Sequence, residues 1–262
     1  MISYESFFLL ILVSILGPVI GFLVLIFYNS NEKRVYVLEM ENRQVKLEKD
    51  LEISRYLQLS QQIQPHFLFN ALNSLLGLVR LRQYERLSES FEHLALYLRS
   101  KYMDKEPLYP LSKEIEYTMH YLTIQQLRFG ERLSVEWKVE NGVEEALVIP
   151  YLLQTLVENA FKHGLEMTEE QAKLSINIGR LLEDRIFLYV KDNGPGFLKD
   201  PFAGEGGSEV GLRNIERRLS LLFGSQASIA IGNEAGAPGG AVTVVWPNST
   251  QREGNNNESA CA

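Results

Sequence analysis

The sequence predicts an α+β protein, in which helices come first and a mixed sheet covered by helices on one face follows. Three observations lead to this fold class. Before residue 130 the apolar residues recur at helical spacing, and from Leu133 their period is two. From there the order is strand, helix, strand, strand, helix, strand, strand. That order is typical of an α/β layer sandwich.

The length, charge and residue composition of the chain exclude several classes of function. A chain of 262 residues with 45% apolar content can hold one or two domains with a core. The net charge of −7 argues against a nucleic-acid partner bound through a basic surface. Cys261 is the only cysteine, so an intrachain disulfide is impossible, and the four histidines lack the spacing of a zinc site. These features fit a reducing, intracellular environment.

Residues 7–28 form an almost unbroken apolar run, of roughly the 20 residues that cross a bilayer. We expect a single transmembrane helix rather than a cleaved signal peptide, because the preceding residues contain Glu5 and no lysine or arginine. The positive-inside rule places the body of the protein in the cytoplasm, on a cell membrane, and we expect no extracellular sensor domain. Basic residues follow the span, at Lys33, Arg34, Arg43, Lys46 and Lys49.

Residues 31–64 are charged and contain neither proline nor glycine, which favours a continuous helix leaving the membrane. Met40, Leu47 and Leu51 fit a heptad seam, whereas Ser54 and Gln58 do not. A signal-transmitting coiled coil and a solvated helix are both compatible with this segment.

The following segment carries the first candidate for chemistry, His66. Pro65 removes a backbone donor, so we expect the helix to kink and to turn His66 towards solvent. A neutral imidazole there is a nucleophile, and a histidine buried in a helical bundle is the alternative. At helical spacing the sequence offers an apolar face of Leu68, Ala71, Leu72, Leu75 and Val79, and a polar stripe of Gln62, His66, Asn70 and Asn73.

A second amphipathic helix follows and completes a helical hairpin. Such a hairpin needs a partner to bury its apolar face, so we expect a homodimer with a four-helix bundle. After Pro107 and Pro110 a third helix is predicted, with Ser112 as its N-cap and Gly130 as its stop. The apolar positions of the second helix are Leu87, Phe91, Leu94, Leu98 and Tyr102.

The second half alternates strands and helices. We expect strands at 133–139, 173–180, 185–191, 227–232 and 241–246, helices at 150–164 and 210–223, a glycine-rich loop at 203–208, and a disordered tail after Pro247.

The helix at 150–164 carries a group of polar residues on neighbouring turns. The amide oxygen of Asn159 is a hard ligand suited to Mg²⁺, and Lys162 can supply positive charge to phosphates beside His163. The alternative is a surface helix with an ion pair between Glu158 and Lys162.

Two glycine-containing segments add to this pattern. Asp192 ends a predicted strand, and Gly194 and Gly196 after it permit close backbone approach. The carboxylate can accept a hydrogen bond from an exocyclic amine such as that of adenine, although the same residues also suit a simple turn. The loop before Gly211 and Leu212 ends at a helix N-terminus, where backbone amides favour phosphate.

Together these motifs resemble the LytS-type sensor histidine kinases, which combine an internal histidine kinase region with a GHKL-type ATPase domain. The likeness covers roughly residues 57–247. It rests on Gln64 to Asn70, Arg128 and Phe129, Leu153 and Gln154, Glu158 to Ala160, Lys162 to Gly164, Asp192 to Gly196, and Gly211 and Leu212 with Asn214, Arg217, Arg218 and Leu219.

The resemblance implies a fold and a set of roles. The hairpin would dimerise and carry His66 as the autophosphorylated residue, and the C-terminal part would be a Bergerat-type α/β sandwich that binds ATP and Mg²⁺. Asn159 would bind the Mg²⁺ and Asp192 would recognise adenine. The phosphoryl group would pass to an aspartate of a response regulator in a two-component system. The other nucleotide-binding positions would be Lys162, His163, Gly194, Gly196, Gly211 and Leu212.

The expected regions are a transmembrane anchor at 1–30, a signal-transmitting helix at 31–60, dimerisation and phosphotransfer helices at 61–130, an ATP-binding domain at 131–247 and a tail at 248–262.

Two departures from the family pattern keep a rival function open. Glu209 stands where relatives often have glycine, and no acidic residue follows His66, so Glu158 is the catalytic base candidate only by its place in the motif. The rival is a non-catalytic ATP-binding membrane scaffold that regulates a partner kinase or transporter. An ATPase that works without His66 is a third reading. A separate membrane protein is a candidate for the sensing role.

Overall fold

The computed structural model describes residues 33–54, 65–103, 106–169, 171–181, 184–197, 210–233 and 239–249, with single positions at 16, 21, 25, 27 and 28. They belong to two compact units, residues 1–52 and 53–262, and residues 33–54 are helical. Most of the predicted span at 7–28, the glycine-rich loop with Glu209, and the tail beyond 249 lie outside these residues. Among the described residues no helix is both long and apolar enough to cross a membrane.

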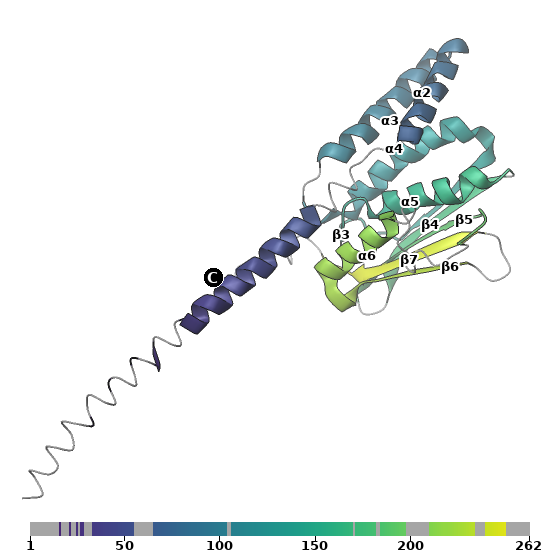
Figure 1. The fold of residues 1–262 in the computed structure, drawn as a ribbon. Coiled ribbons are helices and arrows are strands. Elements are labelled where there is room, and N and C mark those ends of the chain that lie inside the picture. Colours follow the sequence, from purple (N-terminus) through teal and green to yellow (C-terminus); the bar gives the residue numbers. More distant parts are fainter. Residues whose placement is uncertain are drawn as a thin grey trace, which may run out of the picture. The chain divides into compact units, whose positions relative to one another are not determined.

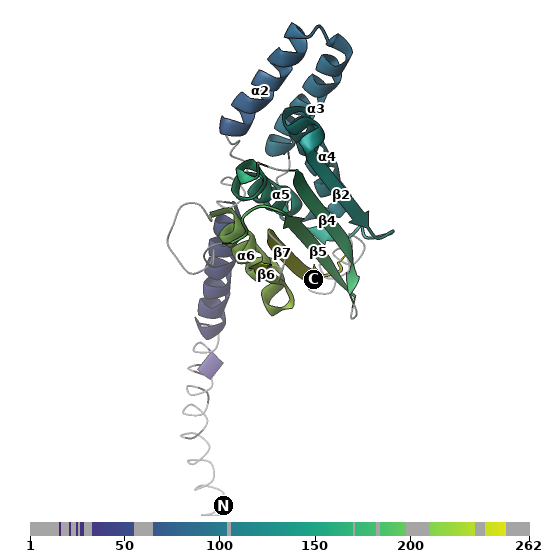
Figure 2. The same cartoon turned by 90° about the vertical axis from the view of Figure 1, so that its right-hand side faces the viewer.

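Helices α2 (Pro65–Arg80) and α3 (Tyr84–Met103) form the predicted hairpin (Figure 2). The described part of α2 opens at Pro65, so the predicted kink at this proline involves the preceding residues 55–64 and lies outside the described residues. The buried side chains of α2 differ from the predicted face. They are Phe67, Ala71, Leu75 and Leu78, whereas Leu72 and Val79 are exposed.

Helix α4 (Leu111–Phe129) follows a short strand, β1 (Tyr109–Pro110). The predicted N-cap at Ser112 is wrong, because α4 begins at Leu111. The backbone N–H groups of Leu111 and Ser112 donate to the carbonyls of Ala146 and Glu144, so another segment supplies the cap. The predicted stop is confirmed: Gly130 ends the helix with φ 62°, a conformation that favours glycine.

A five-stranded mixed sheet forms the second half, as the sequence predicts (Figure 1). Its order is β2-β4-β5-β7-β6, and only the β2–β4 pair is parallel. A second, two-stranded sheet pairs β1 with β3 (Leu147–Val148) and was not predicted. The strands of the large sheet are β2 (Leu133–Val139), β4 (Ala172–Leu181), β5 (Arg185–Asp192), β6 (Ser228–Asn233) and β7 (Gly240–Pro247).

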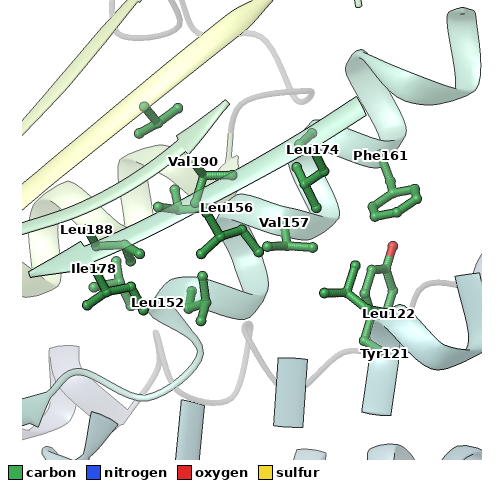
Figure 3. Packing of buried hydrophobic residues seen from close by; sticks show 14 of the residues in the cluster. Tyr121, Leu122, Leu152, Leu156, Val157, Phe161, Leu174, Ile178, Leu188 and Val190 are labelled. Atoms are coloured by element: carbon green, nitrogen blue, oxygen red, sulfur yellow. The ribbon is translucent and has the colours of Figure 1, made fainter. Parts of the chain in front are cut away.

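Helices α5 (Leu152–His163) and α6 (Val210–Phe223) pack on the sheet, and α6 occupies the predicted residues. Short 3-10 turns cover Gly130–Arg132, Leu165–Met167 and Gly224–Gln226. Figure 3 shows the side chains of α5 meeting those of β4 and β5, while Tyr121 and Leu122 of α4 face Phe161. One apolar core therefore runs from the hairpin through α4 and α5 to the sheet.

Candidate functional site

Asp192, the last residue of β5, is buried beside two glycine backbones. Its Oδ1 accepts hydrogen bonds from the N–H of Gly194 at 2.8 Å and of Gly240 at 3.4 Å. Burial raises the pKa of Asp192, and the two backbone donors oppose that rise. The side chain is thus held in one orientation, as recognition of a ligand amine requires.

Three chain segments meet at Asp192 more closely than side chains would allow. A Cβ on Gly194 would lie 2.2 Å from the Cα of Gly164, and a Cβ on Gly164 would lie 2.3 Å from Oδ1 of Asp192. A Cβ on Gly239 would lie 1.8 Å from the carbonyl oxygen of Asp192. Only glycine fits these three positions, so Gly164 at the end of α5, Gly194 after β5 and Gly239 before β7 converge on Asp192.

The loop after β5 is pinned by Asn233 at the end of β6. The Asn233 amide accepts from the N–H of Phe197 at 2.7 Å and donates to its carbonyl at 2.9 Å. Gly196 within the loop has φ 76°, and a Cβ there would lie 2.7 Å from Oδ1 of Asn233. The loop therefore needs glycine at 196 and is not a simple tight turn.

Asn159 lies on α5 beside the first turn of α6. A Cβ on Gly211 would lie 3.0 Å from Cγ2 of Thr155 and 3.5 Å from Nδ2 of Asn159. The first backbone N–H groups of α6 have no partner within the helix, and the helix dipole makes this end positive. An oxygen ligand for a cation and an anion-binding helix end are thus neighbours, which fits a metal-bound phosphate.

The other polar residues of the α5 motif do not share the position of Asn159 beside α6. Lys162 is exposed and His163 is half-buried. Glu158 is buried and faces α3, where its Oε1 lies 3.1 Å from Nζ of Lys101. The alternative ion pair between Glu158 and Lys162 is therefore wrong, since the partner of Glu158 comes from the hairpin.

His66 is exposed in the first turn of α2, as predicted. The side-chain nitrogen of Asn70 lies 3.3 Å from each imidazole nitrogen, so the predicted polar stripe is real at these two positions. The next residue, Phe67, is buried. The structure gives no contact between His66 and the described residues around Asp192.

A buried polar cluster that sequence reasoning missed fixes the start of α5. Glu114 of α4 accepts hydrogen bonds from the hydroxyl of Tyr109 and the N–H of Tyr151, and from the N–H of Gln154 at 3.2 Å. Arg218 of α6 donates to the carbonyl of Pro150 at 2.6 Å. Burial raises the pKa of Glu114 and lowers that of Arg218 to about 10. This cluster links α4 to α5, which carries Asn159, and to α6, which carries Gly211.

Sequence reasoning also missed Gly164, Gly239 and Gly240 as site residues. Gly164 belongs to the motif from Lys162 to Gly164 that carries the family resemblance, but it was given no nucleotide-binding role, and Gly239 and Gly240 belong to none of the motifs. For Gly239 and Gly240 the signal is the glycine pair where a strand begins, which indicates close backbone approach.

Two family models match the chain. The model described as histidine kinase matches residues 54–133, and the one described as histidine kinase-, DNA gyrase B-, and HSP90-like ATPase matches residues 146–251. The first ends in β2, and the second contains Asn159, Asp192 and Gly211. Together they span the hairpin and the site around Asp192.

Similar proteins carry related names. The chain is 34% identical over 221 residues to the sensor protein LytS of Bacillus subtilis, covering 80% of this chain and 36% of that protein. It is 33% identical over 204 residues to the sensor histidine kinase YesM of the same organism, covering 77% and 34%. The chain thus spans about a third of the length of these two relatives.

Among solved structures, the histidine kinase domain of the blue-light activated histidine kinase of Erythrobacter litoralis EL346 is similar with a TM-score of 0.41 and 18% identity. That match covers 78% of this chain and 98% of the other. A likeness at this TM-score carries no conclusion about function.

Proposed function

We propose, from the premise that this chain belongs to the LytS-type family of sensor histidine kinases, that it phosphorylates its own His66 from ATP and passes the phosphoryl group to a response regulator. The observation that carries the proposal is the buried Asp192 carboxylate, which is oriented by Gly194 at a point where the backbones of Gly164 and Gly194 pack too closely for side chains. A buried carboxylate held in one orientation is the kind of placed polar group that fixes the orientation of a bound ligand.

The nucleotide is assigned to the region between α5, the loop after β5 and the start of α6. Asp192 would accept a hydrogen bond from the adenine amine, and Gly194 and Gly196 would leave room for the ring. Gly211 and Leu212 would present the first N–H groups of α6 to the phosphates. Lys162 and His163, in the last turn of α5, would add polar contacts to the nucleotide.

Asn159 is the residue proposed to hold Mg²⁺, and its position beside Gly211 supports that assignment. A bound Mg²⁺ would neutralise charge on the phosphates during transfer. The chain's own part is then to hold ATP and the acceptor in line.

His66 is the proposed nucleophile. Its exposure at the start of α2 supports this role, because the acceptor must meet a nucleotide held elsewhere. In the reaction the bond between the γ-phosphorus and its bridging oxygen breaks, an N–P bond forms at the imidazole, ADP leaves and the imidazole proton is released. Glu158 is kept as the second catalytic candidate, since it precedes Asn159 and its carboxylate faces the hairpin.

The partners follow from the same proposal. Apolar side chains are exposed along α2, and this face supports a homodimer formed through the hairpin. They are Phe69, Leu72, Leu76 and Val79. The apolar run at 7–28 supports a single-pass anchor in the cell membrane with the described body in the cytoplasm.

The test is autophosphorylation of the full chain in membranes with γ-labelled ATP and Mg²⁺, beside His66→Gln and Asn159→Ala. We expect label that is stable to alkali and labile to acid, and its loss in both variants. ATP binding without any label in membranes, with and without a co-expressed membrane sensor, would overturn the proposal in favour of the non-catalytic scaffold.

A further inference from the structure

A buried ion pair joins the hairpin to helix α5. Lys101, in the last turn of α3, is 2% exposed, and its Nζ lies 3.1 Å from Oε1 of Glu158. The same oxygen accepts hydrogen bonds from the hydroxyl of Tyr97 at 3.1 Å and from Nε2 of Gln154 at 2.9 Å. Burying two charges costs free energy unless they are paired and hydrogen-bonded, so this arrangement is a built contact.

Aromatic rings enclose the lysine. Its Nζ lies 5.5 Å from the ring centroid of Tyr97 and 5.2 Å from that of Tyr151, within the range of cation–π attraction. The Tyr151 hydroxyl donates to the carbonyls of Ser100 and Lys101 at 3.2 and 3.3 Å. Tyr151 itself has φ 65° and directly precedes α5. The last turn of α3 is therefore fixed to both turns of α5 that precede Asn159.

The same contact is also connected to α2, the helix that carries His66. Phe67, the residue after His66, packs on Tyr97 with 4.8 Å between the ring centroids. The Tyr97 hydroxyl bonds to Glu158, the residue before Asn159. Two contacts, Phe67 to Tyr97 and Tyr97 to Glu158, thus connect the neighbours in sequence of the proposed nucleophile and the proposed metal ligand.

The geometry points to Lys101 as a positioning residue for phosphoryl transfer, which holds the α5 turn of Asn159 in place relative to the helix of His66. The inference rests on the proposed function and adds a residue outside the matched nucleotide motifs. Lys101 acts through Glu158, and the structure gives it no contact with the described residues around Asp192. Glu158 faces α3, whereas Asn159 faces Gly211 of α6.

This placement predicts a split between rate and binding. ATP affinity depends on Asp192, its glycines and Asn159, and none of these contacts is made by Lys101. The transfer rate depends on the alignment of nucleophile and phosphorus, where a misplacement of about 1 Å can cost roughly 100-fold. Removing the ammonium should therefore lower the rate and leave ATP affinity nearly unchanged.

The experiment compares Lys101→Met and Lys101→Arg in the full chain. It measures the autophosphorylation rate at saturating ATP and, separately, the affinity for a fluorescent ATP analogue. We expect Lys101→Met to lose about 10- to 100-fold in rate with affinity within about threefold. Lys101→Arg should recover most of the rate, because the guanidinium keeps the charge and the donors. Lys138→Met is the matched control, since it breaks an exposed pair with Glu136 of 2.9 Å on β2.

A second variant covers the case that Lys101→Met does not fold, since Glu158 would then be buried without its cation. Tyr97→Phe removes only the hydroxyl that bonds to Glu158 and keeps the ring on Phe67. We expect a smaller loss of rate, again with unchanged ATP affinity, in a protein whose melting temperature stays near that of the wild type.

Three results would overturn the inference. They are a rate within about twofold of wild type in both Lys101→Met and Tyr97→Phe, a higher rate in either variant, and a parallel loss of rate and affinity, which would indicate a purely structural role. A wild-type chain that forms no phosphohistidine is a different failure, because it overturns the proposed function before any variant is compared.

Discussion

Replacing Gly194 by alanine is the sharpest steric perturbation of the site. The added Cβ would lie 2.2, 2.6 and 2.7 Å from three backbone atoms of Gly164. Carbon atoms in contact are about 3.5 Å apart, so one of the two backbones must move by more than about 1 Å. Neither neighbour is a flexible side chain, and overpacking of this kind costs about 1–3 kcal/mol.

We expect Gly194→Ala to lower the free energy of unfolding by that amount and to weaken ATP binding at least tenfold, because the displaced loop carries the donor that orients Asp192. The assays are urea unfolding and titration with a fluorescent ATP analogue. Gly77→Ala is the matched control. Gly77 lies within α2 with nothing within 4 Å of its added Cβ, so alanine should stabilise the helix by about 0.5–1 kcal/mol.

The reasoning would be refuted if Gly194→Ala bound ATP like the wild type and unfolded at the same urea concentration. Equal effects of the two glycine substitutions would refute it as well, because the argument depends on the close approach at Gly194 and not on glycine itself.

Three further predictions concern the adenine contact, acid stability and the hairpin. Asp192→Asn should keep the hydrogen bond from Gly194 and the fold, yet weaken ATP binding by about 10- to 100-fold in a titration, since bonds to charged groups contribute about 1.5–3 kcal/mol. Burial and the neighbouring His93, whose Nδ1 lies 2.9 Å from that of His120, lower the pKa of His120. The folded protein therefore binds fewer protons there, so this group's contribution to stability is complete above about pH 6.5 and is lost as the pH falls through the folded pKa. His120→Gln should flatten that part of the unfolding free energy measured against pH. Leu76→Arg on α2 should shift the oligomer to monomer in light scattering without loss of secondary structure, whereas Leu181→Arg, at a position that is also 46% exposed, should not.

Where a segment has one buried face, its period predicts the element correctly. The alternation of Leu133, Val135, Trp137 and Val139 predicts β2, and the pattern at 210–223 predicts α6. In both cases one face is apolar and the other polar, so local pattern and tertiary burial agree.

The buried face of α2 could not be predicted in the same way, because the helix is apolar on more than one side. Phe67 and Leu78 are buried, whereas Leu72 and Val79 fit the helical period equally well and are exposed. Choosing between these faces requires knowing that α3 and α4 pack on one of them. The cap of α4 is missed for a related reason, since Ala146 and Glu144 supply it from a distant segment.

The residues of the candidate site likewise fall into those that the sequence predicts and those that only the fold brings together. Asp192, Gly194 and Asn159 stand in short motifs, so their chemistry can be predicted from spacing. Lys101 and Tyr97 lie in an ordinary amphipathic helix, and their contact with Glu158 spans 57 and 61 residues of sequence. Only the packing of α3 on α4 and α5 brings them together.

The most direct test of the central claim is to locate the phosphoryl group by mass spectrometry of peptides from the autophosphorylated full chain, kept at alkaline pH. The account predicts phosphohistidine at His66 and none at His93, His120 or His163. Phosphorylation at one of those three, or at a residue other than histidine while His66 stays unmodified, would contradict it.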